Sequence, residues 1–337
     1  MSKSANVSPV RQQYLDIKAK HQDAILFFRL GDFYETFDDD AELVAKELDI
    51  VLTSRNVAKG VRVPMAGIPH HAMENYLSRL IEKGYHIAIC EQVGDTPVNG
   101  LMPREVVRIV TPGTIVEPGL LPGDKNNYLA AFVLSDSHAG VAHVDITTGE
   151  FAATELTGMD IQTAVRAELN RLHPAELLIP DSIDLSEWEN GLPGFQTFYP
   201  AWRFEPGRSE ESLKTQFEAA SLDGYGLRGH SLAVRAAGGI LQYLKETQPA
   251  ALNLLAGISF YQLSEFMVLD ANTRRNLELV ETLRDRRVKG SLLGVLDQTI
   301  TPMGGRMLNQ WVSRPLLDVD VILSRQEGVA HFFEDGL

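Results

Sequence analysis

The largely apolar run from Ala24 to Leu30 ends at the pair Gly31-Asp32, and this combination constrains the fold more than any other part of the sequence. A short run of aliphatic and aromatic residues is typical of a buried strand, and glycine followed by aspartate indicates a turn. The next residues, Phe33-Tyr34-Glu35-Thr36-Phe37, therefore start a second element at the end of a strand. The two phenylalanines are four residues apart, which also suits the buried face of a helix with the glutamate in solvent. Spacing alone leaves the role of the first phenylalanine open.

The composition is that of a globular protein with more than one domain. A chain of 337 residues can bury two or three cores, and its 44% apolar and 23% charged residues are ordinary for a soluble protein. The sequence has no long charge-free apolar run and no apolar signal-peptide core near Met1, so we expect neither a membrane span nor secretion. Cys90 is the only cysteine, which excludes an intrachain disulfide and favours a reducing, cytoplasmic location.

The net charge of −14 is unevenly distributed along the chain. A strongly acidic protein is a poor partner for nucleic acid, because contacts to phosphate need lysine and arginine. Residues 113–250, however, carry −10 of the −14, and the segments on either side are close to neutral. We therefore expect a polyanion to meet residues 1–112 or 251–337, and the acidic middle segment to meet protein.

Residues 1–112 have the pattern of a compact α/β domain. Helices are predicted over residues 41–48 and 73–83, and strands over residues 85–90 and 106–110. The segment 63–71 is punctuated by proline and glycine, so we interpret it as a loop.

Two polar clusters in this domain are candidates for metal ligation, Asp38-Asp39-Asp40 and His70-His71. Consecutive residues diverge around a helix, and acidic residues favour a helix N-terminus, so we interpret the aspartates as the start of a helix. The histidine pair lacks the cysteine or third spaced histidine of a zinc site. We therefore expect no metal site here.

Residues 113–126 are rich in proline and glycine, so we place a linker there, followed by a second domain over residues 127–247. Strands are predicted over residues 127–135, 139–147, 149–156 and 175–180, and a helix over residues 160–172. Strands that run into a helix and then a further strand suggest a ribonuclease-H-like sheet.

Such a sheet raises the alternative of a metal-dependent nuclease in residues 127–247, because enzymes of this kind cleave phosphodiesters with clustered carboxylates that hold two metal ions. Asp136 and Asp145 are the candidate carboxylates, and Asp136 falls in a turn. Fold analogy alone does not establish an activity. A protein-interaction role for this acidic domain stays open beside the nuclease hypothesis.

From residue 248 onward the pattern is helical. Helices are predicted over residues 262–283 and 291–298, from Thr301-Pro302 onward, and over residues 318–333. No further helices follow to cover their apolar faces, so we expect residues 248–337 to be the truncated first part of an all-α domain.

Six motifs, in a fixed order from about residue 9 to the end of the chain, resemble the N-terminal part of the MutS family of bacterial DNA mismatch recognition proteins. They are Gly31-Asp32-Phe33-Tyr34-Glu35, Pro64-Met65-Ala66-Gly67-Ile68-Pro69-His70, Ala88-Ile89-Cys90-Glu91-Gln92, Arg108-Ile109-Val110-Thr111-Pro112-Gly113-Thr114, Asp270-Ala271-Asn272-Thr273-Arg274-Arg275-Asn276-Leu277-Glu278 and Thr301-Pro302-Met303-Gly304. The resemblance implies an α/β protein with a mixed-sheet mismatch-recognition domain in residues 1–112, a ribonuclease-H-like connector in 127–247, and the start of an all-α core or lever domain in 248–337.

In that family the phenylalanine of a Phe-x-Glu motif stacks on a mispaired base from the minor groove and the glutamate hydrogen-bonds that base. These roles fall here on Phe33 and Glu35. An apolar wedge unstacks and kinks DNA, and a mismatch lowers the cost of unstacking, so the resemblance favours an exposed wedge at Phe33. A carboxylate near phosphates is repelled, so Glu35 gains only if a base offers it a hydrogen-bond donor or if it is itself protonated. Arg55 and Arg108 are our candidates for phosphate contacts that hold the register on DNA.

Full-length members of the family carry a C-terminal ATPase, use ATP and Mg²⁺, form homodimers and work with a MutL-like repair protein. No Gly-x-x-x-x-Gly-Lys-Ser/Thr phosphate loop occurs in this sequence. We therefore expect no enzyme activity and no bound cofactor in this chain. Its expected partner is double-stranded DNA with mispairs or small loops, and its expected location is the bacterial cytoplasm, at the nucleoid.

Overall fold

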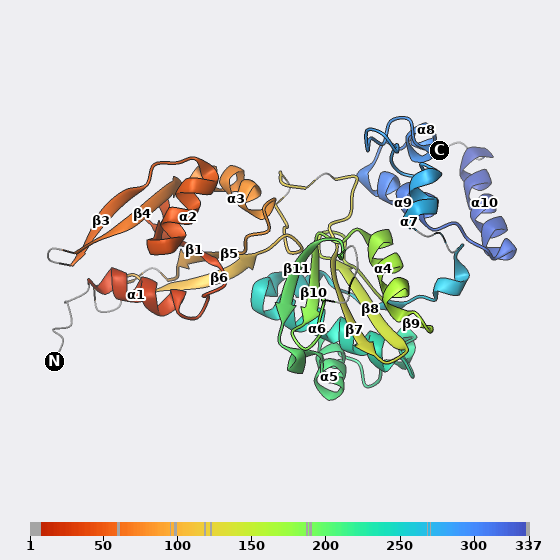
Figure 1. Cartoon of the computed structure of the whole chain (residues 1–337), viewed down its shortest axis with the longest axis horizontal. Helices are drawn as coiled ribbons and strands as arrows, with labels where there is room; N and C mark the ends of the chain where they lie inside the picture. Colours follow the sequence, from red (N-terminus) through yellow and green to blue (C-terminus); the bar gives the residue numbers. More distant parts are fainter. Residues whose placement is uncertain are drawn as a thin grey trace. The chain divides into compact units, whose positions relative to one another are not determined.

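The computed structural model of the chain describes residues 8–58, 61–94, 96–97, 100–117, 119–121, 123–186, 188, 191–267, 269 and 271–334. The chain divides into two compact units, which are described separately (Figure 1). The first comprises Met1–Leu121 with Tyr243–Asn253, and the second comprises Pro122–Gln242 with Leu254–Leu337. The change of unit after Leu121 falls inside the linker expected at residues 113–126.

The first unit is built around one mixed sheet. Its elements in chain order are α1 (Pro9–Lys18), β1 (Ile25–Leu30), β2 (Phe33–Phe37), α2 (Asp38–Leu48), β3 (Thr53–Ala58), β4 (Val61–Pro69), the 3-10 helix η1 (His70–Ala72), α3 (Met73–Ile81), β5 (Ile87–Gln92) and β6 (Arg104–Val110). The described strands lie in the order β3-β4-β2-β1-β5-β6. Of these neighbours only β1 and β5 run parallel, and the other neighbouring pairs are antiparallel.

The two faces of this sheet have different covers. One face packs against α2 and α3, and its core contains Phe27, Tyr34 and Ile68 from the strands with Leu48 and Leu77 from the helices. The other face meets α1 through the fully buried ring of Tyr14, which packs with apolar residues of the central strands. At the β1–β2 turn, Gly31, Asp32 and the adjoining strand residue Phe33 are exposed.

The second unit contains the other described sheet and the helices that follow it. Its strands are β7 (Leu129–Ser135), β8 (His138–Asp145), β9 (Glu150–Thr157), β10 (Glu176–Pro180), β11 (Phe195–Tyr199) and β12 (Ser259–Phe260), in the order β11-β10-β7-β8-β9-β12. The strands β7, β8 and β9 form an antiparallel meander, and β10 and β11 add in parallel on the β7 side. The predicted strands and the predicted helix of residues 127–180 are confirmed.

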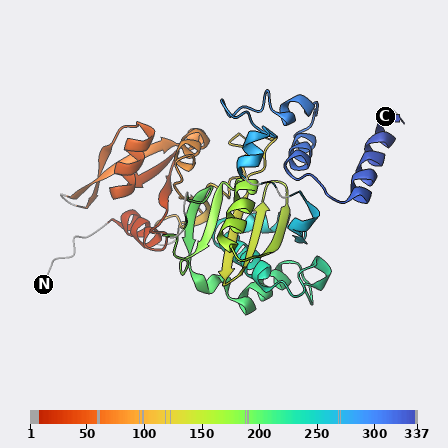
Figure 2. The ribbon, with the colours of Figure 1, turned by 45° about the vertical axis from the view of Figure 1, so that its right-hand side comes forward.

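Helices cover both faces of this sheet (Figures 1 and 2). The helix α4 (Ile161–Leu172) packs Val165 and Leu169 against Phe132 and Val141 of the sheet. The segments η2 (Ala201–Phe204), α5 (Pro206–Gln216), η3 (Asp223–Tyr225) and α6 (Ser231–Thr247) follow in sequence. The end of α6 and most of the next segment, η4 (Pro249–Leu254), fall in the stretch Tyr243–Asn253 that is grouped with the first unit.

The residues after β12 form more and shorter helices than predicted. It contains η5 (Leu263–Glu265), α7 (Ala271–Asn276), α8 (Leu292–Leu296), α9 (Pro302–Ser313) and α10 (Val319–Glu334). A continuous helix over residues 262–283 was therefore the wrong prediction, although Asp270 within it lies outside the described residues. The predicted start of α9 is confirmed, since Thr301 caps it by accepting a hydrogen bond from the Gly304 amide and Pro302 occupies its first turn.

The α/β class with two mixed sheets is confirmed, whereas the prediction of a loop over residues 63–71 was wrong. Residues 63–71 are not a loop, because β4 occupies Val61–Pro69 and pairs with both β2 and β3. Within the described residues, no helix is long and apolar enough to cross a membrane.

Candidate nucleic-acid interface

The turn between β1 and β2 sets the positions of Phe33 and Glu35 at the candidate site. Leu30 and Phe33 form the last pair of the hairpin, so Gly31 and Asp32 make a two-residue turn. Gly31 has φ +61°, which a side chain would disfavour, and glycine at the first central position gives a turn that matches the twist of the strands. The sequence Gly31-Asp32 thus fixes the register of β2.

Alternation along β2 places Phe33, Glu35 and Phe37 on one face of the sheet. Phe37 is buried, with 4% of its surface exposed, and its ring meets that of Tyr14 edge to face at 4.9 Å. Phe33 lies beyond this packing and is 46% exposed. The helical interpretation of these two phenylalanines was wrong, because they share the face of a strand, and only one of them belongs to the core.

Tyr34 points to the opposite face and belongs to the core under α2 and α3. Burial raises the pKa of its phenol, and so does the hydrogen bond that the phenol donates to the Glu91 carboxylate. Its ring also packs near that of His70, at 5.8 Å. Tyr34 therefore anchors β2 while its neighbours on either side face the other way.

Glu35 is held by an arginine from another strand. Its side chain is 15% exposed, and its carboxylate forms a hydrogen-bonded ion pair with the guanidinium of Arg55, whose side chain is 44% exposed. The register places the two residues on one face of the sheet, because Phe37 pairs with Met65 of β4 and Met65 pairs with Thr53 of β3. Arg55 follows Thr53 by two residues and so lies on the same face as Glu35.

The residue opposite Glu35 on β4 is Gly67. A Cβ atom there would lie 3.8 Å from Cγ of Glu35 and 3.9 Å from Cδ1 of Phe33, which are ordinary contact distances. The glycine therefore leaves open the surface between these two side chains, and backbone strain does not require it. Sequence reasoning placed Gly67 in a motif but gave it no role at the site.

Arg108 lies elsewhere. It is on β6, three strands away from β2, and pairs with Ile89, whose side chain belongs to the core under α2 and α3. Its guanidinium nitrogen is 2.6 Å from the carboxylate of Glu117, which is only 6% exposed. The structure thus brings Phe33, Glu35 and Arg55 together on one face and places Arg108 on the other.

The hairpin of β3 and β4 has a charge pattern that sequence reasoning overlooked. No aspartate or glutamate occurs between Asp49 and Glu74, in a chain of net charge −14. Besides Arg55, this stretch carries Arg62, whose exposed guanidinium donates to the carbonyl of Ser54 at 3.2 Å. The signal was visible in the sequence as the absence of acidic residues over a full hairpin.

The two carboxylates of the nuclease hypothesis do not share a site. Asp136 lies in the hairpin between β7 and β8, and Asp145 lies at the far end of β8, about 20 Å away at the usual rise of a strand. Asp145 is fully buried and accepts hydrogen bonds from Asn126, Asn127 and Thr147. A two-metal centre needs ions about 4 Å apart, so this hypothesis is wrong for these residues.

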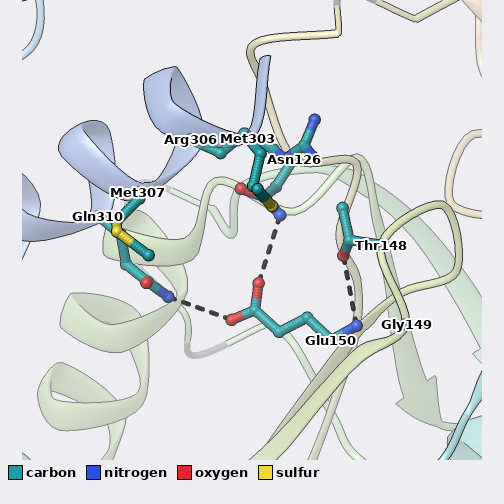
Figure 3. A pocket seen from close by; sticks show the side chains of 8 residues that line it. All are labelled: Asn126, Thr148, Gly149, Glu150, Met303, Arg306, Met307 and Gln310. Carbon is teal, nitrogen blue, oxygen red and sulfur yellow. Dashed lines mark hydrogen bonds between the residues drawn. The ribbon is translucent and has the colours of Figure 1, made fainter. Parts of the chain in front are cut away.

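The second unit also contains a cavity of about 370 Å³ between the β8–β9 turn and α9 (Figure 3). It is lined by Asn126, Thr148, Gly149, Glu150, Met303, Arg306, Met307 and Gln310. The Glu150 carboxylate accepts hydrogen bonds from Asn126 at 3.3 Å and from Gln310 at 3.2 Å, so its oxygens are already engaged. Among the residues that the structure describes, no group of three side chains is arranged to hold a metal ion.

Three family models match successive parts of the chain. Residues 8–118 match the family model of MutS domain I, residues 127–256 that of MutS domain II, and residues 272–337 that of MutS domain III. The DNA mismatch repair protein MutS of Dehalococcoides mccartyi is 48% identical over 335 residues, covering 98% of this chain and 38% of the relative. The proteins of the same name from Symbiobacterium thermophilum and Halothermothrix orenii are 46% and 45% identical, over 96% of this chain and 38% and 36% of their own lengths.

These three matches follow one another along the chain and together cover most of it. The chain belongs to the MutS family, and it spans little more than a third of the length of the curated relatives it matches.

Proposed function

We propose that the first unit binds mispaired DNA, with Phe33 as a wedge that enters the minor groove and stacks on the mispaired base. The observation that carries this proposal is the contrast within one strand face: Phe37 is buried, while Phe33 is 46% exposed and belongs to none of the core clusters formed by the described residues. Inserting an apolar side chain unstacks a base step and kinks the duplex. A mismatch lowers that cost, so selection rests on the deformability of DNA and not on its sequence.

Glu35, next to the wedge on the same face, is proposed to hydrogen-bond the mispaired base. Its carboxylate carries charge toward a polyanion, so it favours binding only where a base offers a donor.

Arg55 is proposed to contact backbone phosphate, and the acid-free hairpin around it supports this role. For Arg108, the ion pair with buried Glu117 supports a structural role in place of the phosphate contact that its sequence suggested.

A band-shift comparison tests the wedge. We expect the intact protein to prefer a mismatched duplex over a matched duplex of the same sequence context, and Phe33→Ala to reduce that preference at least about fivefold, since aromatic stacking on a base contributes about 1–3 kcal/mol. Phe195→Ala is the matched control, because Phe195 on β11 is an equally large side chain with 40% exposure in the other unit. Equal mismatch preference in Phe33→Ala and the unmodified protein would contradict the proposal.

The division of labour along the chain is also a proposal. We assign mismatch recognition to residues 1–112, a linker to 113–126, a connector to 127–247, and the start of a helical core to 248–337, in line with the order of the matched family models. The acidic connector suits a protein partner, for which a MutL-like repair protein is our candidate. Homodimer formation, ATP and Mg²⁺ binding by a part outside this chain, and action in the bacterial cytoplasm are proposed from family membership.

A further inference from the structure

The carboxylate that is proposed to read the base is already occupied. In the described part of the chain, Arg55 is the hydrogen-bond donor that the structure gives to Glu35. A base that needs this carboxylate must therefore displace Arg55, or Arg55 must leave for another reason. The inference below rests on the proposed mismatch-binding function and concerns how the two residues act in sequence.

We propose that Arg55 is a charge switch for Glu35. In the protein without DNA, Arg55 holds the Glu35 carboxylate. When DNA binds, the guanidinium exchanges the carboxylate for a backbone phosphate, and Glu35 is released toward the base that Phe33 has unstacked.

The position of Arg55 suits such an exchange. It lies on β3, the outer strand of the described sheet, and its side chain is 44% exposed, so it can turn toward a ligand without disturbing the core. The planar guanidinium matches phosphate as well as carboxylate. The acid-free stretch between Asp49 and Glu74 means that the hairpin itself offers no second carboxylate to retain it.

The exchange makes recognition conditional. Breaking the ion pair costs the same on every duplex. On matched DNA, the released carboxylate of Glu35 finds no donor and is repelled by phosphates, whereas at a mispair it finds a donor. Gly67 leaves the surface between Phe33 and Glu35 open, so the base can reach the carboxylate.

A double-mutant cycle on binding to a matched duplex tests the exchange, with Arg55→Gln, Glu35→Gln and the double variant of the intact protein measured by fluorescence anisotropy. If the ion pair breaks on binding, the free energy needed to break it opposes DNA binding by the unmodified protein. Each single variant lacks the ion pair and binds more tightly by this amount. The double variant gains the same amount only once. The product of the two single fold-changes in affinity should then exceed the fold-change of the double variant. For an exposed ion pair we expect an excess of about two- to fivefold.

Arg62→Gln supplies the matched control, because Arg62 is an exposed arginine of the same hairpin whose hydrogen bond is to a carbonyl and not to Glu35. Its cycle with Glu35→Gln should be additive. An additive Arg55 cycle would overturn the switch, because the ion pair would then persist in the complex with DNA. An excess of opposite sign would also overturn it, because the ion pair would then form only on DNA. The same excess in the Arg62 cycle would also overturn it, as a general effect of charge.

The same measurements separate this inference from the proposed function. If the unmodified protein binds matched and mismatched duplexes equally, the mismatch-binding proposal fails, and the switch fails with it. If the mismatch preference is present and is lost in Phe33→Ala, while the Arg55 cycle is additive, only the switch is wrong.

Discussion

Replacing Glu168 by glutamine should destabilise the second unit and remove a large part of its pH dependence. Glu168 lies on α4 and is 2% exposed. Its carboxylate accepts from Nε of Arg171 at 2.8 Å and from the phenol of Tyr261 at 2.5 Å, and a guanidinium nitrogen of Arg314 is 3.9 Å away. Breaking a buried pair of this kind typically costs about 3–5 kcal/mol, because a buried charge is left uncompensated.

The pH dependence follows from the pKa of Glu168. Burial raises this pKa, but the charge of Arg171 and the hydrogen bonds to the carboxylate more than offset burial, so the pKa falls from 4.5 to about 2. A carboxyl group with a depressed pKa in the folded state adds stability above its unfolded pKa and loses it as the pH falls. The contribution is about 3 kcal/mol at neutral pH, begins to fall below pH 4.5, and is reduced by about 2 kcal/mol at pH 3.

Urea unfolding followed by tryptophan fluorescence measures this effect in the relevant unit, since Trp188, Trp202 and Trp311 all belong to the second unit. The difference in unfolding free energy between the unmodified protein and Glu168→Gln should be large at pH 7 and about 2 kcal/mol smaller at pH 3. Glu211→Gln, which changes an exposed carboxylate on α5, should stay within about 0.5 kcal/mol of the unmodified protein at both pH values. An equal difference for Glu168→Gln at pH 7 and pH 3 would refute the reasoning.

Two further predictions concern the open face of the first unit. In circular-dichroism unfolding, Phe37→Ala should cost about 3–5 kcal/mol as a core truncation, whereas Phe33→Ala should cost less than about 1.5 kcal/mol because half of its surface is already exposed; similar losses would mean that Phe33 is a core residue. Gly67→Val should keep or raise stability, since valine suits a strand and the added Cβ meets its neighbours at ordinary distances. The same variant should lower mismatch preference about tenfold by covering the Glu35 carboxylate, and unchanged preference in a band shift would show that the surface over Gly67 is not used.

Sequence reasoning predicted the elements whose signals are local. The helix α4 and the strands around it emerged from periodicity and turn residues, and the start of α9 from the pair Thr301-Pro302. The prediction for residues 63–71 was wrong because proline and glycine suggest a loop, whereas β2 and β3 pair with β4 and hold it extended. Tertiary pairing outweighed local propensity there.

The sequence left open whether Phe33 is buried or exposed, for a geometric reason. A separation of four residues, from Phe33 to Phe37, is close to one helical turn and is also two full strand repeats, so both structures place these side chains on one face. Which of the two is exposed depends on how far α1 extends over the sheet, through Tyr14. Only the family motif, and not the spacing, indicated an exposed Phe33.

The pairing of Arg55 with Glu35 was beyond sequence reasoning. The two residues are 20 positions apart, and their strands are not neighbours, because β4 lies between β3 and β2. Only the order of strands in the sheet reveals the contact. The placement of Arg108 on the opposite face has the same origin, since it depends on the pairing of β6 with β5.

The two-residue turn at Gly31-Asp32 also limits how this surface can change in evolution. Side chains alternate between the two faces of the sheet along β2, so the register of β2 decides which side chains lie on each face. An insertion of one residue that shifts β2 by one position in its pairing with β1 and β4 would bring Tyr34 and Thr36 to the face where Phe33 and Glu35 now lie, and Phe33 and Glu35 to the opposite face. A single-codon insertion at this turn therefore has two outcomes: a longer turn that keeps the register, or a shifted β2 whose two faces are exchanged.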